Sequence, residues 1–442
     1  MIILLSACED NTTQKVSGND SEQKELSNKM PKNILKVREF ISENMPKTVR
    51  ITPKDSASYI GLPKPYSVPC VKDGFQEMYY WDSYFTNIGL IADGNIQQAQ
   101  NNIDNILFLI KQNNFMPNAS HMALLNRSQP PYASMMVRDV YEKTQDKEWL
   151  KYACGVLEIE YKEFWMKKRI SPNGLNTYGH HATDDYCLRF YNFILKRIPE
   201  FDTSMVNSDD DKIRIGGHFL AEAESGWDFN PRFDARCRDF NPVDLNSNLY
   251  MYEINFAFFY EELSLDGAEE WLNKADTRKR LMNEFCFDQE KGLFYDYDFV
   301  NKQLSEVYSA ASLSPLFSGL TSSSQANVIT SQLNKLEFEY GISACEKENR
   351  KYTYQWDFPN AWPCVQYIAI KGLDNYGFKS DAKRVAQKYV DAQLRSFEST
   401  SNLWEKHNVE KGDLDVNNEY EMPPFMGWTA GVFIYASDYI SK

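Results

Sequence analysis

The sequence predicts an all-α protein with a single folded domain. Apolar residues recur at spacings of three and four, the period of a helix, whereas the strict alternation of half-buried strands is scarce. One apolar stripe contains Leu245, Leu249, Tyr252, Phe256, Phe259 and Leu263. Beyond residue 32, no linker, low-complexity stretch or change in composition marks a second domain.

Helices are expected in regular succession along the chain. A second apolar stripe contains Ile103, Ile106, Leu107 and Ile110. Further helical patterns, with Ser380 as an N-cap, cover residues 33–44, 82–92, 131–144, 147–168, 268–285, 324–335, 360–372, 380–398 and 428–441. Most of the chemically distinctive residues fall at helix starts or in irregular segments, at 114–132, 216–241 and 404–425. This distribution favours a helical scaffold that carries its site on loops at one end.

The first residues resemble the end of a bacterial lipoprotein signal. A short apolar run and small residues precede Cys8, which would be acylated and become the mature N-terminus. We therefore expect a truncated signal at 1–8, a polar tether at 9–32 and one folded domain at 33–442. This predicts a lipid-anchored protein of the bacterial cell envelope, periplasmic or on the outer membrane, with no other membrane contact.

Charge and cysteine content argue against several functions. The net charge is -14 and the pI is near 5.0, so no nucleic-acid partner is expected. The cysteines after Cys8 are odd in number and lack C-x-x-C spacing, which indicates neither a metal site nor a complete disulfide framework. A metal site at His180, His181 and His218 is an alternative, although adjacent histidines in a polar loop are usually only that. We expect a monomer that binds a small ligand.

Two strings mix aromatic rings with acids and amides. Residues 74–85 read Gly-Phe-Gln-Glu-Met-Tyr-Tyr-Trp-Asp-Ser-Tyr-Phe, and residues 355–362 read Gln-Trp-Asp-Phe-Pro-Asn-Ala-Trp. Buried carboxylates need partners, so a plain apolar core does not require this mixture. Sugars do require it, because their C–H faces stack on aromatic rings and their hydroxyls bind carboxylates. The strings therefore favour carbohydrate recognition over an aromatic-rich core.

Two carboxyl groups are candidates for glycosidic chemistry. Cleavage of a glycosidic bond needs one protonated carboxyl and one ionised carboxyl. Asp228 follows Trp227, and Glu405 follows Trp404, an apolar neighbour that can raise the pKa of a carboxyl. Spacing alone does not separate these residues from surface acids.

Together these strings resemble the trehalase family of inverting glycoside hydrolases, in order from about residue 40 to 440. The family's Phe-x-Glu-x-Tyr-Tyr-Trp-Asp-Ser-Tyr run matches 75–84, and its Gln-Trp-Asp-x-Pro-Asn-Gly-Trp run matches 355–362 with Ala361 for Gly. Its Arg-Ser-Gln-Pro-Pro and Pro-Val-Asp-Leu-Asn strings match 127–131 and 242–246. The resemblance implies a single (α/α)6 barrel and no metal or other cofactor.

The resemblance also implies roles for particular residues. Asp228, in Glu-Ser-Gly-Trp-Asp, would be the acid, and Glu405, in Glu-Lys-His where the family has Glu-Lys-Tyr, would be the base. The substrate would be contacted by Phe75, Tyr79, Trp81, Asp82, Asn118, Arg127, Ser128, Gln129, Gly226, Trp356 and Glu419. Simpler interpretations are that Asp82 caps a helix and that Arg127 forms a structural ion pair.

The chain departs from the family at three places. Gly74 stands where the family has a sugar-binding Arg. The family's Arg-Pro-Glu-Ser segment is absent, and 186–190, with Arg189 as a weak substitute, occupy its region. The family's Gly-rich lid is replaced by the polar residues 411–418. These changes leave the predicted catalytic pair in place and affect the choice of disaccharide.

The resemblance implies hydrolysis of α,α-trehalose to two glucose molecules with inversion. One alternative is a related (α/α)6 inverting glycosidase acting on another α-glucoside, which the altered Arg positions would favour. A second alternative is a sugar-binding lipoprotein without catalysis. Such a protein would keep Trp81 and Asp82 but not both catalytic carboxyls, and both are present.

Overall fold

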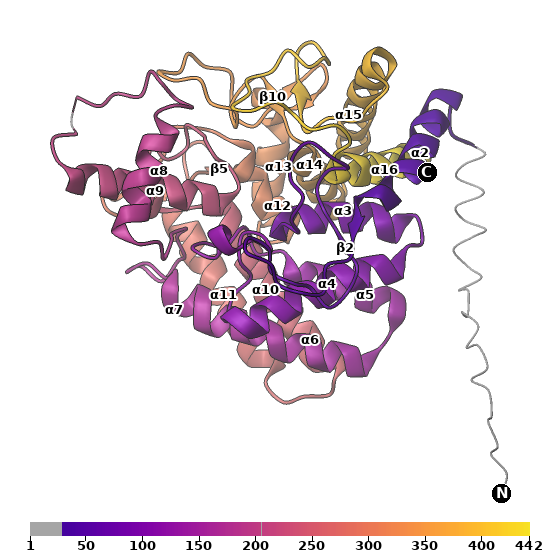
Figure 1. The fold of residues 1–442 in the computed structure, drawn as a ribbon, viewed down its shortest axis with the longest axis horizontal. Coiled ribbons are helices and arrows are strands. Elements are labelled where there is room, and N and C mark those ends of the chain that lie inside the picture. The colour runs from indigo at the N-terminus through magenta and orange to yellow at the C-terminus, as the bar shows by residue number, and fades with distance from the viewer. Residues whose placement is uncertain (1–28, 205) are drawn as a thin grey trace, which may run out of the picture.

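The computed structural model describes residues 29–204 and 206–442. The predicted signal with Cys8, and residues 9–28 of the predicted tether, lie outside these ranges. The described chain forms the two-layered ring of helices of an (α/α)6 barrel (Figure 1). Within it, no helix combines the length and apolar character needed to cross a membrane.

Six helices of the described chain form the inner ring. They are α3 (Tyr80–Ala92), α5 (Ala133–Thr144), α10 (Val243–Glu262), α12 (Ser314–Ser318), α14 (Pro363–Asn375) and α16 (Gly427–Ser441). Each packs against the next, and α16 packs against α3, which closes the ring. Because outer helices return the chain between them, the inner helices begin at the same end of the barrel.

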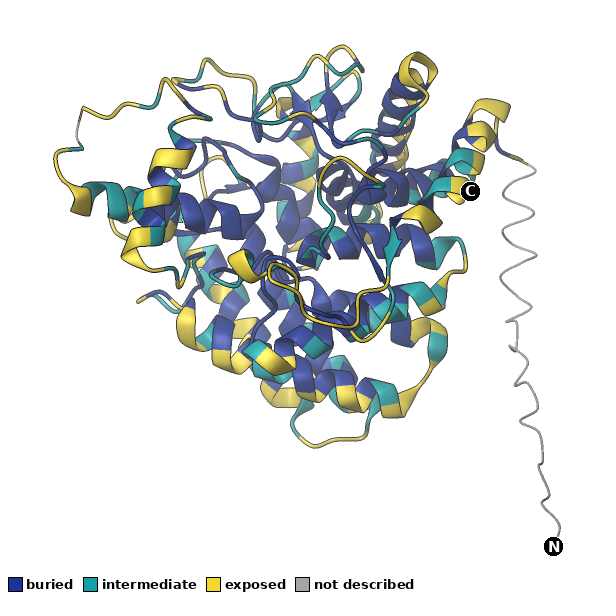
Figure 2. Cartoon of the chain, in the orientation of Figure 1, coloured by how far each residue is buried: buried dark blue, intermediate teal, exposed yellow. Residues whose placement is uncertain are grey.

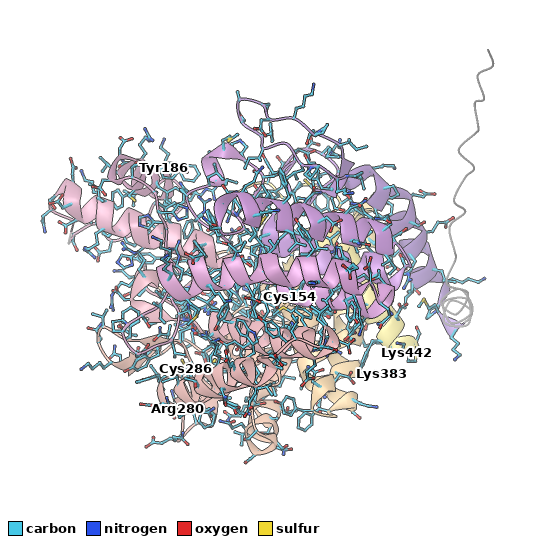
Figure 3. The ribbon with its side chains drawn as sticks, turned by 90° about the horizontal axis from the view of Figure 1, so that it is seen from below. Cys154, Tyr186, Arg280, Cys286, Lys383 and Lys442 are labelled. Atoms are coloured by element: carbon cyan, nitrogen blue, oxygen red, sulfur yellow. The ribbon has the colours of Figure 1, made fainter. Side chains whose placement is uncertain are left out.

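The outer layer covers this ring on its sides. Its helices are α2 (Lys32–Asn44), α4 (Ile96–Asn113), α6 (Lys147–Ile159), α11 (Ala268–Phe285), α13 (Ser323–Ser331) and α15 (Lys379–Thr400). The outer helices bury one face and expose the other, whereas α10 and α14 are buried around most of their circumference (Figure 2). Cys154 of α6 marks this outer layer in the view from below (Figure 3).

The strands are two residues long and tie loops together. The antiparallel pairs are β1 (Val49–Arg50) with β2 (Tyr66–Ser67), β4 (Phe287–Asp288) with β5 (Leu293–Phe294), β8 (Glu337–Phe338) with β9 (Gly341–Ile342), and β10 (Asn360–Ala361) with β11 (His407–Asn408). The β6 strand (Tyr297–Asp298) lies between β3 (Phe240–Asn241) and β7 (Gln303–Leu304).

Most predicted helices are confirmed, with corrections at four places. The helix predicted at 324–335 ends at Ser331 as α13, and the 3-10 helix η6 (Leu333–Lys335) follows it. Residues 147–168 form α6, the π-helical η3 (Glu160–Trp165) and α7 (Met166–Lys168) in succession. The N-cap of α15 is Phe378, and Ser380 lies inside the helix, so the predicted cap is wrong. The helix predicted from residue 360 begins at Pro363, because residues 360 and 361 pair with β11 and proline suits a first helical turn.

An unexpected hairpin of two helices protrudes from the barrel. It consists of α8 (Asp184–Ile194) and α9 (Asp209–Ser225), and Tyr186 marks its edge in Figure 3. Part of α9 lies in the segment 216–241, which the sequence analysis takes as irregular. The helix is favoured by a capping box between Ser208 and Asp211 and by acidic residues in its first turn.

Candidate active site

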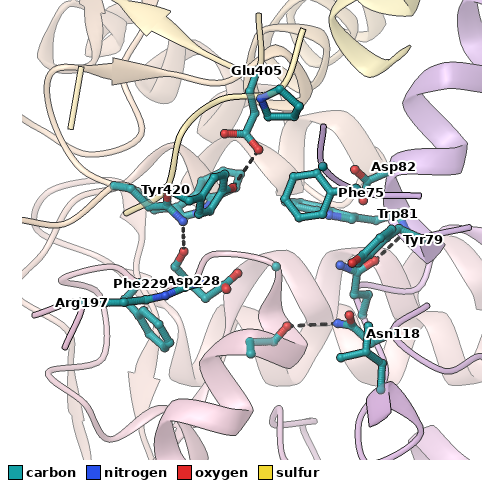
Figure 4. A pocket seen from close by; sticks show the side chains of 18 of the residues that line it. Phe75, Tyr79, Trp81, Asp82, Asn118, Arg197, Asp228, Phe229, Glu405 and Tyr420 are labelled. Atoms are coloured by element: carbon teal, nitrogen blue, oxygen red, sulfur yellow. Dashed lines mark hydrogen bonds between the residues drawn. The ribbon is translucent and has the colours of Figure 1, made fainter. Parts of the chain in front are cut away.

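A cavity of about 450 Å³ lies at the end of the barrel where the inner helices begin. Its walls come from the loops before α3, α5, α10, α14 and α16 and from α8. Figure 4 shows Glu405 and Asp228 on opposite sides of the cavity. The volume suits a small molecule.

Most of the predicted site residues meet at this cavity. The lining includes Phe75, Tyr79, Trp81, Asp82, Asn118, Arg127, Gln129, Gly226, Asp228, Trp356 and Glu405. These residues come from distant parts of the sequence, and the closed ring of inner helices brings their loops together.

Ser128 and Glu419 are predicted site residues that the structure does not bring to the cavity surface. The Ser128 hydroxyl donates to the Met116 carbonyl at 2.6 Å, and its backbone N–H donates to Glu224 at 2.9 Å. Glu224 is held by Arg169 through hydrogen bonds of 2.7 and 2.8 Å. Glu224, held in place by Arg169, therefore anchors the end of α9 to the segment that contains Ser128.

Tryptophan rings form one apolar surface of the cavity. Trp356 and Trp362 are stacked, with centroids 3.8 Å apart and planes within 1°. The Trp81 centroid lies 5.6 Å from that of Trp356 and 5.9 Å from that of Trp428. Such rings offer flat apolar faces to the C–H faces of a sugar.

Asp228 owes its position to the end of α9. That helix stops at Gly226, whose φ is +73°, and a Cβ on Gly226 would lie 2.7 Å from Cζ2 of Trp81. Glycine therefore meets two needs here, a left-handed turn and close approach to the indole. Beyond the turn, the side-chain amide of Gln355 donates to the Asp228 carbonyl at 2.5 Å.

The surroundings of Asp228 favour its protonated form. Burial raises the pKa of Asp228 to about 6, although the positive charges of Arg197 and Arg127 oppose the rise. Burial likewise raises the pKa of Asp82 to about 7. Burial and the charge of Asp228 raise the pKa of Glu419 to about 7. The cavity therefore contains carboxyl groups that can carry protons near neutral pH.

Glu405 has different partners. Its Oε2 accepts a hydrogen bond from Nζ of the fully buried Lys406 at 2.8 Å, and its Oε1 accepts one from the Tyr420 hydroxyl at 2.8 Å (Figure 4). The Lys406 ammonium also lies 4.6 Å from the ring centroid of Trp362. Both donors bind the ionised form of a carboxyl. Lys406 and Tyr420 are not among the predicted site residues, although Lys406 directly follows the predicted base.

The loop that contains Glu405 is joined to the string at 355–362. The Asn360 amide donates to the Gln355 carbonyl at 2.8 Å and to the Asn417 carbonyl at 2.7 Å. Next to it, Ala361 pairs with His407 across β10 and β11. Burial lowers the pKa of His407 to about 4, so its ring is neutral and contributes to structure. The base loop is thereby fixed to the tryptophan string.

Polar groups line the wall around α3. The Gln129 side chain accepts a hydrogen bond from the Trp81 backbone N–H at 3.3 Å. The Asn118 amide donates to the carbonyls of Ser128 and Ala223 at 3.1 and 3.4 Å. Arg127 is buried, and its Nε has no hydrogen-bond partner among the described residues. It forms no ion pair in the described chain, so the alternative of a structural ion pair is not supported for Arg127.

The departures from the family pattern have structural consequences. A Cβ on Gly74 would lie 2.8 Å from Cβ of Pro423, so this position has no room for a larger side chain unless a loop moves. Arg189 is exposed and paired with Asp185 at 2.8 Å, away from the cavity lining. Arg197, which the sequence analysis does not identify, lines the cavity instead.

The three histidines proposed as an alternative metal site have other contacts. The His181 ring bonds the Leu125 carbonyl at 2.6 Å, and His218 accepts a bond from the Arg238 backbone N–H at 3.3 Å. His180 accepts one from the Ala182 backbone N–H at 3.1 Å. Within the described ranges, no three His, Cys, Asp or Glu side chains are grouped so as to hold a metal.

Comparison with known proteins gives one consistent family. The family model described as Trehalase matches residues 6–441. A trehalase of Tenebrio molitor is 27% identical over 438 residues, covering 90% of this chain and 77% of that protein. A periplasmic trehalase of Xanthomonas axonopodis pv. citri is 30% identical over 416 residues, covering 90% and 72%.

Solved structures agree with this result. The neutral trehalase of Saccharomyces cerevisiae matches with a TM-score of 0.73 and 26% identity, over 85% of this chain and 74% of that chain. A mannosylglycerate hydrolase from Thermus thermophilus matches with a TM-score of 0.60 over 88% of this chain and 99% of that chain. At 17% identity the second match supports the fold alone.

The crowding at Gly226 yields a prediction about stability. Gly226→Ala should lower the free energy of unfolding by about 2–4 kcal/mol, because it adds a clash with Trp81 to the strain of a positive φ. The matched control is Gly377→Ala, where φ is +81° but no atom lies within 4 Å of the added Cβ. The control should lose only about 1 kcal/mol. Urea denaturation measures both changes, and equal losses would contradict the proposed contact.

Proposed function

The chain belongs to the trehalase family of glycoside hydrolases, and from that premise we propose that it hydrolyses α,α-trehalose to two glucose molecules with inversion. In this proposal Asp228 is the general acid and Glu405 is the general base. The observation that supports it most strongly is the pair of carboxyl groups on opposite sides of one cavity, in unlike surroundings. Such a pair is what an inverting mechanism requires.

The proposed reaction is a single displacement. Protonated Asp228 donates its proton to the glycosidic oxygen as the bond from that oxygen to the anomeric carbon breaks. Glu405 removes a proton from a water molecule, whose oxygen attacks the same carbon from the opposite face. Both glucose molecules then leave, and proton exchange with solvent restores the two carboxyls. Lys406 and Tyr420 hold Glu405 in position for the water.

The remaining cavity residues are proposed to bind the substrate. The rings of Trp81 and Trp356 would stack on the C–H faces of the sugar bound between the carboxyls. Asp82 would accept hydrogen bonds from its hydroxyls, and the guanidinium of Arg127, which also lines the cavity, would donate to them. Ser128 does not line the cavity, and it would stabilise the loop that contains Arg127 and Gln129 through its hydrogen bonds to Met116 and Glu224.

A second candidate substrate is another α-linked glucose disaccharide. It is favoured by Gly74, which has no side chain to bind sugar, and by α8, which occupies the region of the family's Arg-Pro-Glu-Ser segment. A sugar-binding protein without catalysis is disfavoured, because both carboxyls and the partners of Glu405 are present at the cavity.

The proposed location is the bacterial periplasm, with a lipid anchor at Cys8. Bacterial relatives named periplasmic trehalase support the compartment. The sequence Leu-Leu-Ser-Ala-Cys before the polar tether supports the anchor. We propose that the enzyme acts as a monomer, since its predicted site residues all come from one chain.

Proton NMR of the first products tests the proposed reaction. Inversion converts one glucose of α,α-trehalose to the β anomer and releases the other as the α anomer, so we expect equal initial amounts of both. Maltose, kojibiose and nigerose are assayed in parallel. Release of the α anomer alone from trehalose would contradict inversion, and cleavage of another disaccharide without trehalose would contradict the proposed substrate.

The same assay tests the two catalytic residues. Asp228→Asn and Glu405→Gln should each lower kcat by about 10²–10⁴-fold with unchanged circular dichroism, because they remove proton transfer but little volume. Asp209→Asn, exposed at the other end of α9, is the matched control and should keep wild-type activity. Near-native turnover by either active-site variant would remove that residue from the mechanism.

The pH dependence follows from the raised pKa of Asp228. The acid must be protonated to react, and its folded pKa is raised to about 6, so active enzyme is lost as pH rises through that value. We expect kcat/KM to fall about tenfold per pH unit above pH 6. A flat profile from pH 6 to pH 8, in protein of constant circular dichroism, would contradict this role for Asp228.

A further inference from the structure

Helix α8 lies on the acid's side of the cavity. Its residues Tyr191 and Ile194 belong to a small hydrophobic cluster that is separate from the barrel core. The same cluster contains Phe219 of α9 and Phe229, the residue after Asp228. The ring centroids of Phe219 and Phe229 are 5.4 Å apart. The hairpin is therefore packed against the acid loop.

The cavity side of this region has an unusual composition. Phe190, Phe193 and Arg197 all line the cavity. Phe193 is 44% exposed, although large apolar rings are usually buried. The Arg197 guanidinium lies 4.6 Å from the Phe193 ring centroid. Together they form a surface with an apolar face beside hydrogen-bond donors.

Arg197 is only partly satisfied by the protein. Its Nη1 donates to one oxygen of Glu419 at 3.3 Å, and the other oxygen of Glu419 accepts from the Phe229 backbone N–H at 3.2 Å. In the described parts of the chain, Nε and Nη2 of Arg197 have no hydrogen-bond partner. A guanidinium has five N–H donors, so several remain for a ligand.

We propose that Arg197 and Phe193 form the subsite for the departing sugar ring. This rests on the proposed function, because the acid must reach the glycosidic oxygen and the leaving ring therefore lies on the acid's side. Figure 4 shows Arg197 beside Asp228 and Phe229, across the cavity from Trp81 and Asp82. The free donors bind hydroxyls of the ring, and Phe193 stacks on its C–H face. The subsite therefore selects a polyhydroxylated ring as leaving group.

Neither Gly74 nor Arg189 supplies this cation. Gly74 has no side chain and packs against Pro423, and Arg189 is exposed in a pair with Asp185. Arg197 is also a positioning residue, since Glu419 links it to the backbone next to Asp228. Binding of the leaving ring and orientation of the acid are therefore coupled through one side chain.

Two substrates separate the leaving-group side of the reaction, which comprises binding of the ring and proton donation by Asp228, from the rest of catalysis. Trehalose has a second sugar ring, whereas α-glucosyl fluoride has the same glucosyl group and no second ring. In Arg197→Met, kcat/KM for trehalose should fall about tenfold to a hundredfold, the effect of losing charged hydrogen bonds. For the fluoride the fall should be less than about threefold, because no ring occupies the subsite.

Further variants control for structural damage. Arg189→Met removes an exposed arginine from α8 and should leave both substrates unchanged. Arg197→Lys keeps the charge and should recover part of the trehalose activity. Phe193→Ala should lower kcat/KM for trehalose and have little effect on kcat/KM for α-glucosyl fluoride. This variant tests the subsite even if Arg197→Met fails to fold.

The outcomes distinguish the subsite from the proposed substrate. If the wild type cleaves maltose, kojibiose or nigerose but not trehalose, the proposed substrate is wrong, and the same comparison is made with the disaccharide that it cleaves. An equal loss for disaccharide and fluoride in folded Arg197 and Phe193 variants would overturn the subsite. Unchanged values for both substrates would overturn it as well.

Discussion

Four carboxyl groups lie in or beside one buried cavity, and their mutual repulsion constrains the whole site. Burial disfavours the charged form of a carboxyl group, and charges of one sign disfavour each other. Burial raises the pKa of Asp228 to about 6 and the pKa values of Asp82 and Glu419 to about 7. These groups therefore bind protons at a higher pH than an ordinary carboxyl group does. Glu405 has instead a buried ammonium 2.8 Å away. These unequal surroundings divide the acid from the base.

The fold makes this arrangement possible. Because the inner helices begin at one end of the ring, the loops that precede them meet there, although their residues are far apart in the sequence. The loops are then fixed to one another by particular contacts. Gly226 turns the acid loop against Trp81, and Asn360 joins the tryptophan string to the base loop. These contacts tie one wall of the cavity together, while the wall formed by α8 belongs to a separate hydrophobic cluster.

The helical architecture could be predicted from the sequence, because helical periodicity is visible in residues that are close together in the chain. The strings that mix acids with aromatic residues could be recognised for the same reason. Asp228 and Glu405 could be named because their strings resemble those of the family, and both line the cavity. Tyr420 and Arg197 could not, since their importance depends on contacts with residues far away in the chain. Likewise Ser128 belongs to a recognisable motif, yet its hydroxyl points to a backbone carbonyl.

In the proposed mechanism, Asp228 and Glu405 act on one bond from opposite sides, with a water molecule between Glu405 and the sugar. A crystal structure with a bound inhibitor that mimics the reacting sugar would measure the separation of the two carboxyl groups directly. The account predicts a separation of about 6.5–9.5 Å, with an ordered water bound to Glu405 and the inhibitor between the carboxyls. A separation near 5 Å, or an inhibitor that contacts only one of the two carboxyls, would contradict it.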